Sequence, residues 1–421
     1  MRAERTLLRR AARAAGACLL LSGWAATAHA QGWSVQFEQA QTADGVTLRL
    51  VRLHNPGGTP VVLLHGIGAN AQEFLLPGRA LGEYLAGLGY DVWCANFRYA
   101  GRGQLASDDA GESSFDALVA FDLPAILDRV RAASGGARPF LLGHSMGGMV
   151  ALAWAAGIER ARVPVSLRLV LRGGRLRLEP VHGWRMRAEP ALAARRAAEI
   201  RGVIAIGSPA RLRWPLVLPR LDPDLYWDVN VVLSSLAWSP AANLALLPLE
   251  RIPASEVVHA LTVDLPQLPH VGPAVRAYLL WVAATIGNSL LSAQFMLPGS
   301  IDPATSYQAL AAAADDLPAG AVRQYLDAIR TRDMREAHVL DPVRAPLSYA
   351  DSHRFIAAPV LWVAGRFDKI ANDDAIEAEF SALATPDKTL LRVDHGHLDL
   401  VIGDRAPQDV WPALVRWLAQ H

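Results

Sequence analysis

The pentapeptide Gly143-His144-Ser145-Met146-Gly147 constrains this chain more than any other stretch. It follows a short apolar run, residues 139–142, and precedes a segment of small and apolar residues, 149–156. A strand, a G-x-S-x-G turn and a helix in this order predict a nucleophile elbow, whose sharp turn exposes a serine hydroxyl. We expect Gly143 and Gly147 to be required because the turn brings strand and helix too close for a Cβ atom. Ser145 is therefore the candidate nucleophile.

The first 30 residues have the features of a secretory signal peptide. Residues 1–13 carry five arginines, residues 14–26 are mostly apolar, and residues 28–30 read Ala-His-Ala, a small-x-small cleavage pattern. The apolar stretch is shorter than the roughly 20 residues that span a bilayer, which disfavours a membrane anchor. We therefore predict an exported protein, periplasmic or secreted, whose mature chain begins at Gln31.

Composition and cysteine content narrow the class of protein. A formal net charge of +1 gives no support for binding to nucleic acid. Beyond the predicted signal peptide the only cysteine is Cys94, in an apolar run, so we expect a buried thiol and no internal disulfide. The histidines lack the spacing of a dedicated zinc site, so we expect no metal and no cofactor.

The hydrophobic pattern of the mature chain predicts an α/β fold. Residues 35–41 and 46–53 alternate apolar and polar around Asp44-Gly45, which is typical of a β-hairpin. The later apolar runs are short, nearly continuous and separated by helical segments, which indicates a mostly parallel sheet with helices on both faces. We expect its strands at residues 60–64, 91–95, 139–142, 202–206, 359–364 and 389–393. Helices are expected at 74–88 and 115–130, the second kinked at Pro124.

A basic insertion, at about residues 160–200, interrupts this pattern. The segment 160–201 holds eleven arginines, and its alternation around Gly173-Gly174 predicts a β-hairpin with an arginine face. Two interpretations stay open. We favour a solvated face, and the alternative is a patch for anionic lipid headgroups or polymer, which would make a peripheral membrane or lipid-surface contact.

A larger insertion, residues 209–355, is rich in Pro, Leu, Trp and Ala. Its segment 274–297 is apolar, but the polar residues within it favour a buried or interfacial helix over a membrane span. An apolar insertion at this point of the chain is where a mainly helical lid would lie. The expected organisation is a signal peptide (1–30), a core (31–208), a lid (209–355) and the end of the core (356–421). Four tryptophans are distributed through the lid: Trp214, Trp227, Trp238 and Trp281.

A serine nucleophile needs a general base, and the base needs a group that orients it. Asp368 follows the predicted strand 359–364, and two histidines, His395 and His397, follow 389–393. The chain order Ser, Asp, His is the order of α/β-hydrolases. We favour His397 as the base because the preceding Gly396 gives its loop freedom to turn.

Two other carboxylates compete with Asp368 for the orienting role. Asp394 and Asp399 are closer to His397 in sequence. Adjacency does not give a carboxylate the right approach to the second ring nitrogen, so we favour Asp368.

The oxyanion of the reaction needs backbone N–H donors. One is expected from Met146, directly after the serine, and the other from Ile67 in the turn His65-Gly66-Ile67-Gly68. In this turn Gly66 and Gly68 allow the backbone its path, and His65 is expected to pin the loop without taking part in the reaction.

Several further motifs resemble acid lipases of the lysosomal and gastric type. They are Tyr90-Asp91-Val92-Trp93, Asn96-Phe97-Arg98, Phe121-Asp122-Leu123-Pro124-Ala125, and His397-Leu398-Asp399 with Gly403. The resemblance covers roughly residues 45–156 and 359–403, and it implies an α/β-hydrolase fold, a lid and hydrolysis of lipid esters. The chain departs from the family at Tyr99, where the family has a glycine after the arginine, and in residues 209–355, where no family motif is found.

The sequence therefore predicts an exported serine hydrolase that cleaves carboxylic esters with apolar acyl chains, from small-molecule or lipid substrates. An acyltransferase or a secreted polyester depolymerase would use the same triad, and both alternatives stay open. A non-catalytic lipid-binding protein on the same fold is disfavoured, because such a protein has no need of nucleophile, base, acid and oxyanion turn in order.

Overall fold

The computed structural model describes residues 32–172, 175–212, 250–252, 254, 295–297, 299–337 and 345–421. The predicted signal peptide lies outside the described residues. So do the four tryptophans of the predicted lid and all but the last three residues of the apolar segment 274–297.

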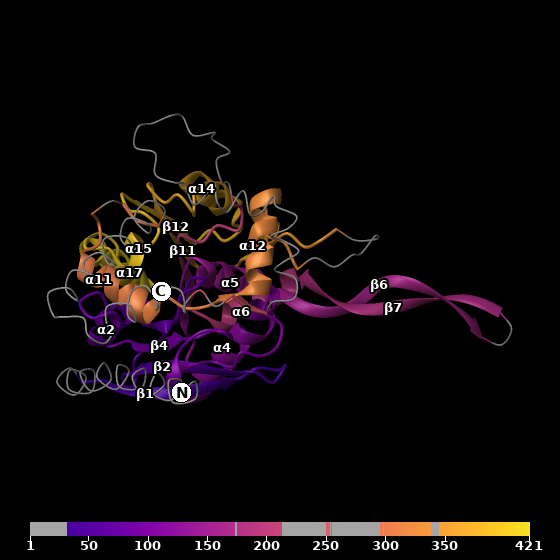
Figure 1. Ribbon diagram of the computed structural model, residues 1–421, viewed down its shortest axis with the longest axis horizontal. Helices are drawn as coiled ribbons and strands as arrows, with labels where there is room; N and C mark the ends of the chain where they lie inside the picture. The colour runs from indigo at the N-terminus through magenta and orange to yellow at the C-terminus, as the bar shows by residue number, and fades with distance from the viewer. Residues whose placement is uncertain are drawn as a thin grey trace, which may run out of the picture.

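An eight-stranded sheet forms the centre of the molecule, in the order β1-β2-β4-β3-β5-β8-β11-β12 (Figure 1). β1 and β2 form the N-terminal hairpin, and β2 also pairs with β4 in antiparallel fashion. All pairs from β4 to β12 are parallel, so the predicted hairpin and mostly parallel sheet are confirmed. The strands are β1 (Ser34–Gln41), β2 (Thr47–His54), β3 (Pro60–Leu64), β4 (Asp91–Ala95), β5 (Phe140–His144), β8 (Gly202–Ile206), β11 (Val360–Gly365) and β12 (Lys388–Val393).

Helices cover both faces of the sheet. Successive strand residues point to opposite sides, so the two faces pack against different helices. On β3, Val62 and Leu64 belong to the cluster formed with α3, α4 and α5, whereas Val61 and Leu63 belong to the cluster formed with α2, α15 and α17. The helices of the core are α2 (Leu81–Gly87), α3 (Phe115–Ala117), α4 (Leu123–Ala133), α5 (Met146–Ala155), α6 (Pro190–Glu199), α14 (Asp373–Ala382), α15 (Asp399–Ile402), α16 (Ala406–Asp409) and α17 (Trp411–Gln420).

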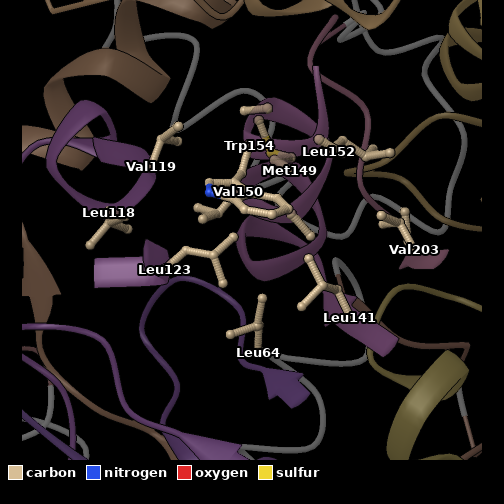
Figure 2. Packing of buried hydrophobic residues seen from close by; sticks show 14 of the residues in the cluster. Leu64, Leu118, Val119, Leu123, Leu141, Met149, Val150, Leu152, Trp154 and Val203 are labelled. Atoms are coloured by element: carbon tan, nitrogen blue, oxygen red, sulfur yellow. The ribbon is translucent and has the colours of Figure 1, made fainter. Parts of the chain in front are cut away.

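Helix α5 is the packing centre of the first cluster. Every one of its ten residues is buried. Figure 2 shows its side chains Met149, Val150, Leu152 and Trp154 among neighbours from strands and helices on several sides. Burying a side chain of this size contributes about 1.5–3 kcal/mol, so the helix that follows Ser145 is held firmly in place.

In the structure, each of the two predicted helices is divided into shorter elements. The segment 74–88 is divided into the 3₁₀ turn η1 (Ala71–Phe74) and helix α2, since Pro77-Gly78, with Gly78 at φ 75°, interrupts it. The predicted kink near Pro124 is a π-helical turn, η3 (Leu118–Asp122), between α3 and α4. Proline has no N–H to donate, and the wider turn accommodates that missing hydrogen bond.

The described parts of the larger insertion pack on this core. Gln324 donates its side-chain amide to Asp116 and accepts from the N–H of Phe115, and Asp315 accepts from Asn70 and from the N–H of Gly101. These parts form α11 (Pro303–Gln308), η6 (Ala309–Ala313), α12 (Ala319–Thr331), α13 (Tyr349–Ser352), η7 (His353–Phe355) and the short strands β9 (Arg251–Ile252) and β10 (Leu317–Pro318). Where the chain is described, no helix is both long enough and apolar enough to span a membrane.

The basic segment forms a β-hairpin of β6 (Ile158–Arg172) and β7 (Arg175–Ala188). It projects from the body of the molecule as a long two-stranded arm (Figure 1). A register shift between Pro164 and Ser166 marks a bulge part-way along it.

Buried ion pairs join the motifs that resemble acid lipases. Arg98, whose side chain is fully buried, donates to Asp122 from its backbone N–H and from Nε, at 2.9 and 2.8 Å. Its two Nη atoms bind Asp44 at 2.8 and 3.0 Å. Asp91 similarly receives two hydrogen bonds from Arg52, each of 2.9 Å. These motif residues therefore tie loops to the sheet.

Asp122→Ala should lower the free energy of unfolding by about 3–5 kcal/mol, because it leaves the Arg98 charge buried with less compensation. Asp128→Ala is the matched control on the same helical segment, since the Asp128 side chain is 74% exposed. The control should change stability by less than about 1 kcal/mol. Urea titration of both variants measures the difference, and equal losses would contradict this role of Asp122.

Candidate active site

Ser145 lies on a strained turn between β5 and α5. Its backbone has φ 52° and ψ −120°, a conformation that non-glycine residues rarely adopt. The turn is held in place because the N–H of Ser145 donates to the carbonyl of Ile206 on β8 at 2.8 Å. Ser145 is half-buried and lies at the carboxyl ends of the parallel strands, directly after β5, as in a nucleophile elbow.

The glycines of the pentapeptide lie where backbone segments meet. A Cβ atom on Gly143 would be 2.2 Å from the nitrogen of Gly148, and one on Gly147 would be 2.2 Å from the carbonyl oxygen of Leu64. Gly148 is a third such position, with a Cβ that would lie 2.2 Å from the Ser208 hydroxyl. Any side chain here would push the strand, the helix or the neighbouring turn apart.

The structure brings Asp368 and His397 together. Asp368 follows β11 and His397 follows β12, and Oδ2 of Asp368 lies 2.7 Å from Nδ1 of His397. Both side chains are buried, and Gly207, at φ 56°, makes room for them: a Cβ there would be 3.2 Å from both atoms. An ionised carboxylate only accepts, so Nδ1 carries the proton and Nε2 is left as a proton acceptor.

Asp368 is itself fixed by its own turn. Its second oxygen, Oδ1, accepts from the N–H groups of Ile370 and Ala371 at 2.8 and 2.7 Å. These two hydrogen bonds fix the carboxylate independently of the imidazole, as the orienting role requires.

The competing residues are engaged elsewhere. Nε2 of His395 lies 3.2 Å from Asp409, and Asp394 is paired with Arg366 on the surface. Asp399 accepts from the N–H groups of Gly396 and Leu297 and from the Ser300 hydroxyl. Through these three contacts Asp399 orders the loop that carries His397 and connects it to Leu297 and Ser300.

The turn proposed for the oxyanion lies beside the serine. A Cβ on Gly66 would be 3.3 Å from Cβ of Ser145, and Met146 is the first residue of α5, where helix N–H groups lack an intrahelical acceptor. Gly68 has φ 67°, and a Cβ there would lie 2.8 Å from Leu317. Ile67, the predicted second donor, occupies the position between these two glycines.

His65 pins this turn, in agreement with the prediction. Its Nδ1 lies 2.8 Å from the carbonyl oxygen of Gly66, and its Nε2 accepts from the N–H of Phe97 at 3.2 Å. Burial lowers the pKa of His65, and the ring, whose Nε2 accepts a hydrogen bond, is neutral. Its two nitrogens thus connect the turn after β3 to the segment after β4.

Glu73 is a buried residue of the site that sequence reasoning missed. Its Oε2 accepts from the N–H of Gly66 at 3.1 Å, and its Oε1 forms a short hydrogen bond with Nδ1 of His144. Nε2 of His144 in turn lies 3.2 Å from the carbonyl oxygen of His397. One carboxylate thus connects the oxyanion turn, the elbow and, through His144, the histidine loop.

Charge holds this connection together. Burial lowers the pKa of His144, but the nearby Glu73 carboxylate outweighs burial and raises it. Burial likewise raises the pKa of Glu73, and the His144 charge and hydrogen bond reverse the shift and lower it. Both His144 nitrogens lie against acceptors, the Glu73 carboxylate and the His397 carbonyl, so both donate and the ring carries a positive charge beside the carboxylate. No group of three or more His, Cys, Asp or Glu suited to hold a metal occurs among the described residues.

Comparisons with known proteins agree with the fold. Residues 59–186 match a family model described as the alpha/beta hydrolase fold. A solved structure of DcsB in complex with its substrate analogue superposes with a TM-score of 0.50 at 15% identity, covering 92% of this chain and 99% of that one. The chain has the α/β-hydrolase fold.

Curated proteins with sequences similar to this chain include gastric triacylglycerol lipases. The Bos taurus protein is 33% identical over 132 residues, which are 28% of this chain and 33% of the lipase. The Homo sapiens protein is 35% identical over 132 residues, with the same two shares. The chain spans about a third of the length of these relatives. The resemblance to acid lipases that the sequence motifs predicted is confirmed.

Glu73→Gln should lower kcat by up to about 10²-fold with little change in KM, because small displacements of reacting groups are costly. The readout is the steady-state rate of ester hydrolysis well below the melting temperature of the variant. Glu83→Gln is the control, since Glu83 is half-buried on α2, where burial alone raises its pKa. A Glu73→Gln enzyme that keeps the wild-type kcat would show that the connection is structural only.

Proposed function

We propose that this chain is a serine hydrolase of carboxylic esters that works through Ser145, His397 and Asp368. One observation carries the proposal: a serine on a strained turn shares the carboxyl edge of the sheet with a buried Asp–His pair. The order of the three residues along the chain is the order of α/β-hydrolase triads.

The proposed reaction needs only groups of this chain. The Ser145 hydroxyl attacks the ester carbonyl while Nε2 of His397 accepts its proton, and Asp368 stabilises the imidazolium that forms. The oxyanion is bound by the N–H groups of Met146 and Ile67. His397 then protonates the leaving alkoxide, and water repeats the sequence to release the acid from the acyl-enzyme.

An apolar acyl chain is the substrate feature that we favour. Support comes from the identity with gastric triacylglycerol lipases and from the apolar composition of residues 209–355, which we propose to act as a lid. Pockets for such ligands are lined mostly by apolar side chains. The arginine-rich start of the chain and its Ala-His-Ala segment support export to the periplasm or beyond.

Hydrolysis of p-nitrophenyl esters from acetate to palmitate tests the proposed function. We expect a rate that depends on Ser145, is lost in Ser145→Ala, and is highest for long acyl chains. A peak at short chains would retain the esterase and reject the lipid preference. Transfer of the acyl group to an added alcohol in competition with water would identify an acyltransferase. No Ser145-dependent turnover on any ester would contradict the proposal.

Asp368→Asn should reduce kcat by about 10⁴-fold with little effect on folding, because the imidazole loses the partner that fixes its tautomer. The measurement is kcat on the best p-nitrophenyl ester together with the melting temperature. Near-normal activity in this variant would remove Asp368 from the triad.

The two neighbouring histidines provide a matched pair of variants. His397→Ala should abolish turnover, whereas His395→Ala should be mild, since His395 faces Asp409 and not Asp368. The same ester assay separates them. The reverse result would exchange their roles.

A further inference from the structure

We propose that the outer part of the β6–β7 hairpin, residues 165–181 (the outer hairpin), docks on the surface of an anionic lipid bilayer. The sequence shows that this segment is rich in arginine. The structure shows in addition that leucine side chains form the other face of the ribbon. This surface binding is independent of the triad and goes beyond ester hydrolysis.

One face of the outer hairpin is formed by leucines. Leu169 is paired with Leu178, and Leu171 with Leu176, so all four side chains lie on the same face. They are 60–67% exposed, whereas most leucines of the core are fully buried. A contiguous set of exposed large apolar side chains on a projecting arm marks an interaction surface.

The opposite face carries positive charge. Arg168 and Arg177 lie on the alternate positions of the two strands and are exposed. The outer hairpin holds four arginines and a single acidic residue, Glu179, although the whole chain has a net charge of only +1. The outer hairpin therefore has a net charge of +3, whereas residues 31–421 as a whole, with 36 basic and 39 acidic residues, have a net charge of −3.

The base of the hairpin fixes the arm to the body. The Arg185 side chain, fully buried, donates from Nε to Glu336 at 3.0 Å, and the N–H of Met186 donates to the other Glu336 oxygen at 2.8 Å. On the other strand, β6, the Arg160 side chain forms an ion pair with Glu112 at 2.9 Å. The arm is therefore presented from a rigid base, and it projects well beyond the globular body (Figure 1).

An anionic bilayer fits both faces at once. An amphipathic segment with leucines on one side and arginines on the other lies in the interface, with its apolar face at the acyl boundary and its arginines among the phosphates. Trp184, 57% exposed on the inner part of the hairpin, is a residue type that favours the headgroup level. Anionic lipids add attraction for each arginine near the surface.

A second copy of the chain fits less well. Four leucine side chains cover much less than the ~800 Å² per partner that a stable protein interface buries. Two arms packed leucine face to leucine face would also leave the arginines, which lie on the opposite face, outside the contact. The charge pattern and the small apolar area therefore favour the lipid surface.

Sedimentation with lipid vesicles tests the proposal. The protein is purified from the cells that produce it, and mass spectrometry identifies its first residue. We expect at least about tenfold stronger binding to phosphatidylcholine vesicles that contain phosphatidylglycerol than to phosphatidylcholine alone. The double variants Leu176→Ser/Leu178→Ser and Arg168→Gln/Arg177→Gln should each lose most of this binding. Leu88→Ser, at an exposed leucine on the body, is the control and should bind as the wild type does.

A shortened hairpin provides a second test that does not depend on the folding of the point variants. It has Asn-Gly in place of residues 165–181, between the paired Pro164 and His182. It should lose vesicle binding and keep the melting temperature and the hydrolysis of soluble esters. Ser145→Ala should bind vesicles as the wild type does, so failure of the docking surface and failure of the proposed enzyme give different results. Binding that survives loss of the leucines, or that ignores phosphatidylglycerol, would overturn the proposal. So would a dimer in analytical ultracentrifugation that the leucine variants abolish.

Discussion

The close approach of three backbone segments around Ser145 is the constraint on which the rest of the site depends. Strand β5, helix α5 and the turn after β3 meet at distances that only glycine permits at Gly143 and Gly147. The positive φ of Ser145 persists because helix α5 is buried at every position and cannot shift to relieve it. The conformation of the turn at Ser145 therefore depends on the packing of the sheet core.

Buried charges complete what packing begins. Among the described residues the one cysteine, Cys94, is a free thiol buried in β4, so no disulfide between them holds the loops at the carboxyl edge of the sheet. Carboxylates take that role: Glu73 joins the oxyanion turn to the elbow, and Asp399 holds the histidine loop by three hydrogen bonds. Both carboxylates thus limit the movement of loops that carry residues of the candidate site.

Strand ends and turn chemistry made much of the site predictable from the sequence. Ser145, Asp368 and His397 each follow a short apolar run, and parallel strands bring their carboxyl ends to one edge. Glu73 was missed because its partners, Gly66 and His144, are set by tertiary packing that no local pattern records. The hairpin was recognised by its arginines, but its leucine face depends on the register of β6 with β7. The helix expected over 74–88 was divided because a Pro-Gly turn outweighed the apolar periodicity.

The most direct test of the central claim is covalent labelling of the folded protein with a fluorophosphonate, followed by peptide mapping by mass spectrometry. We expect one adduct, on Ser145, that forms far more slowly in His397→Ala because the hydroxyl loses its proton acceptor. A folded protein that gains no adduct on Ser145, or that is labelled on another residue while Ser145 stays unmodified, would contradict it.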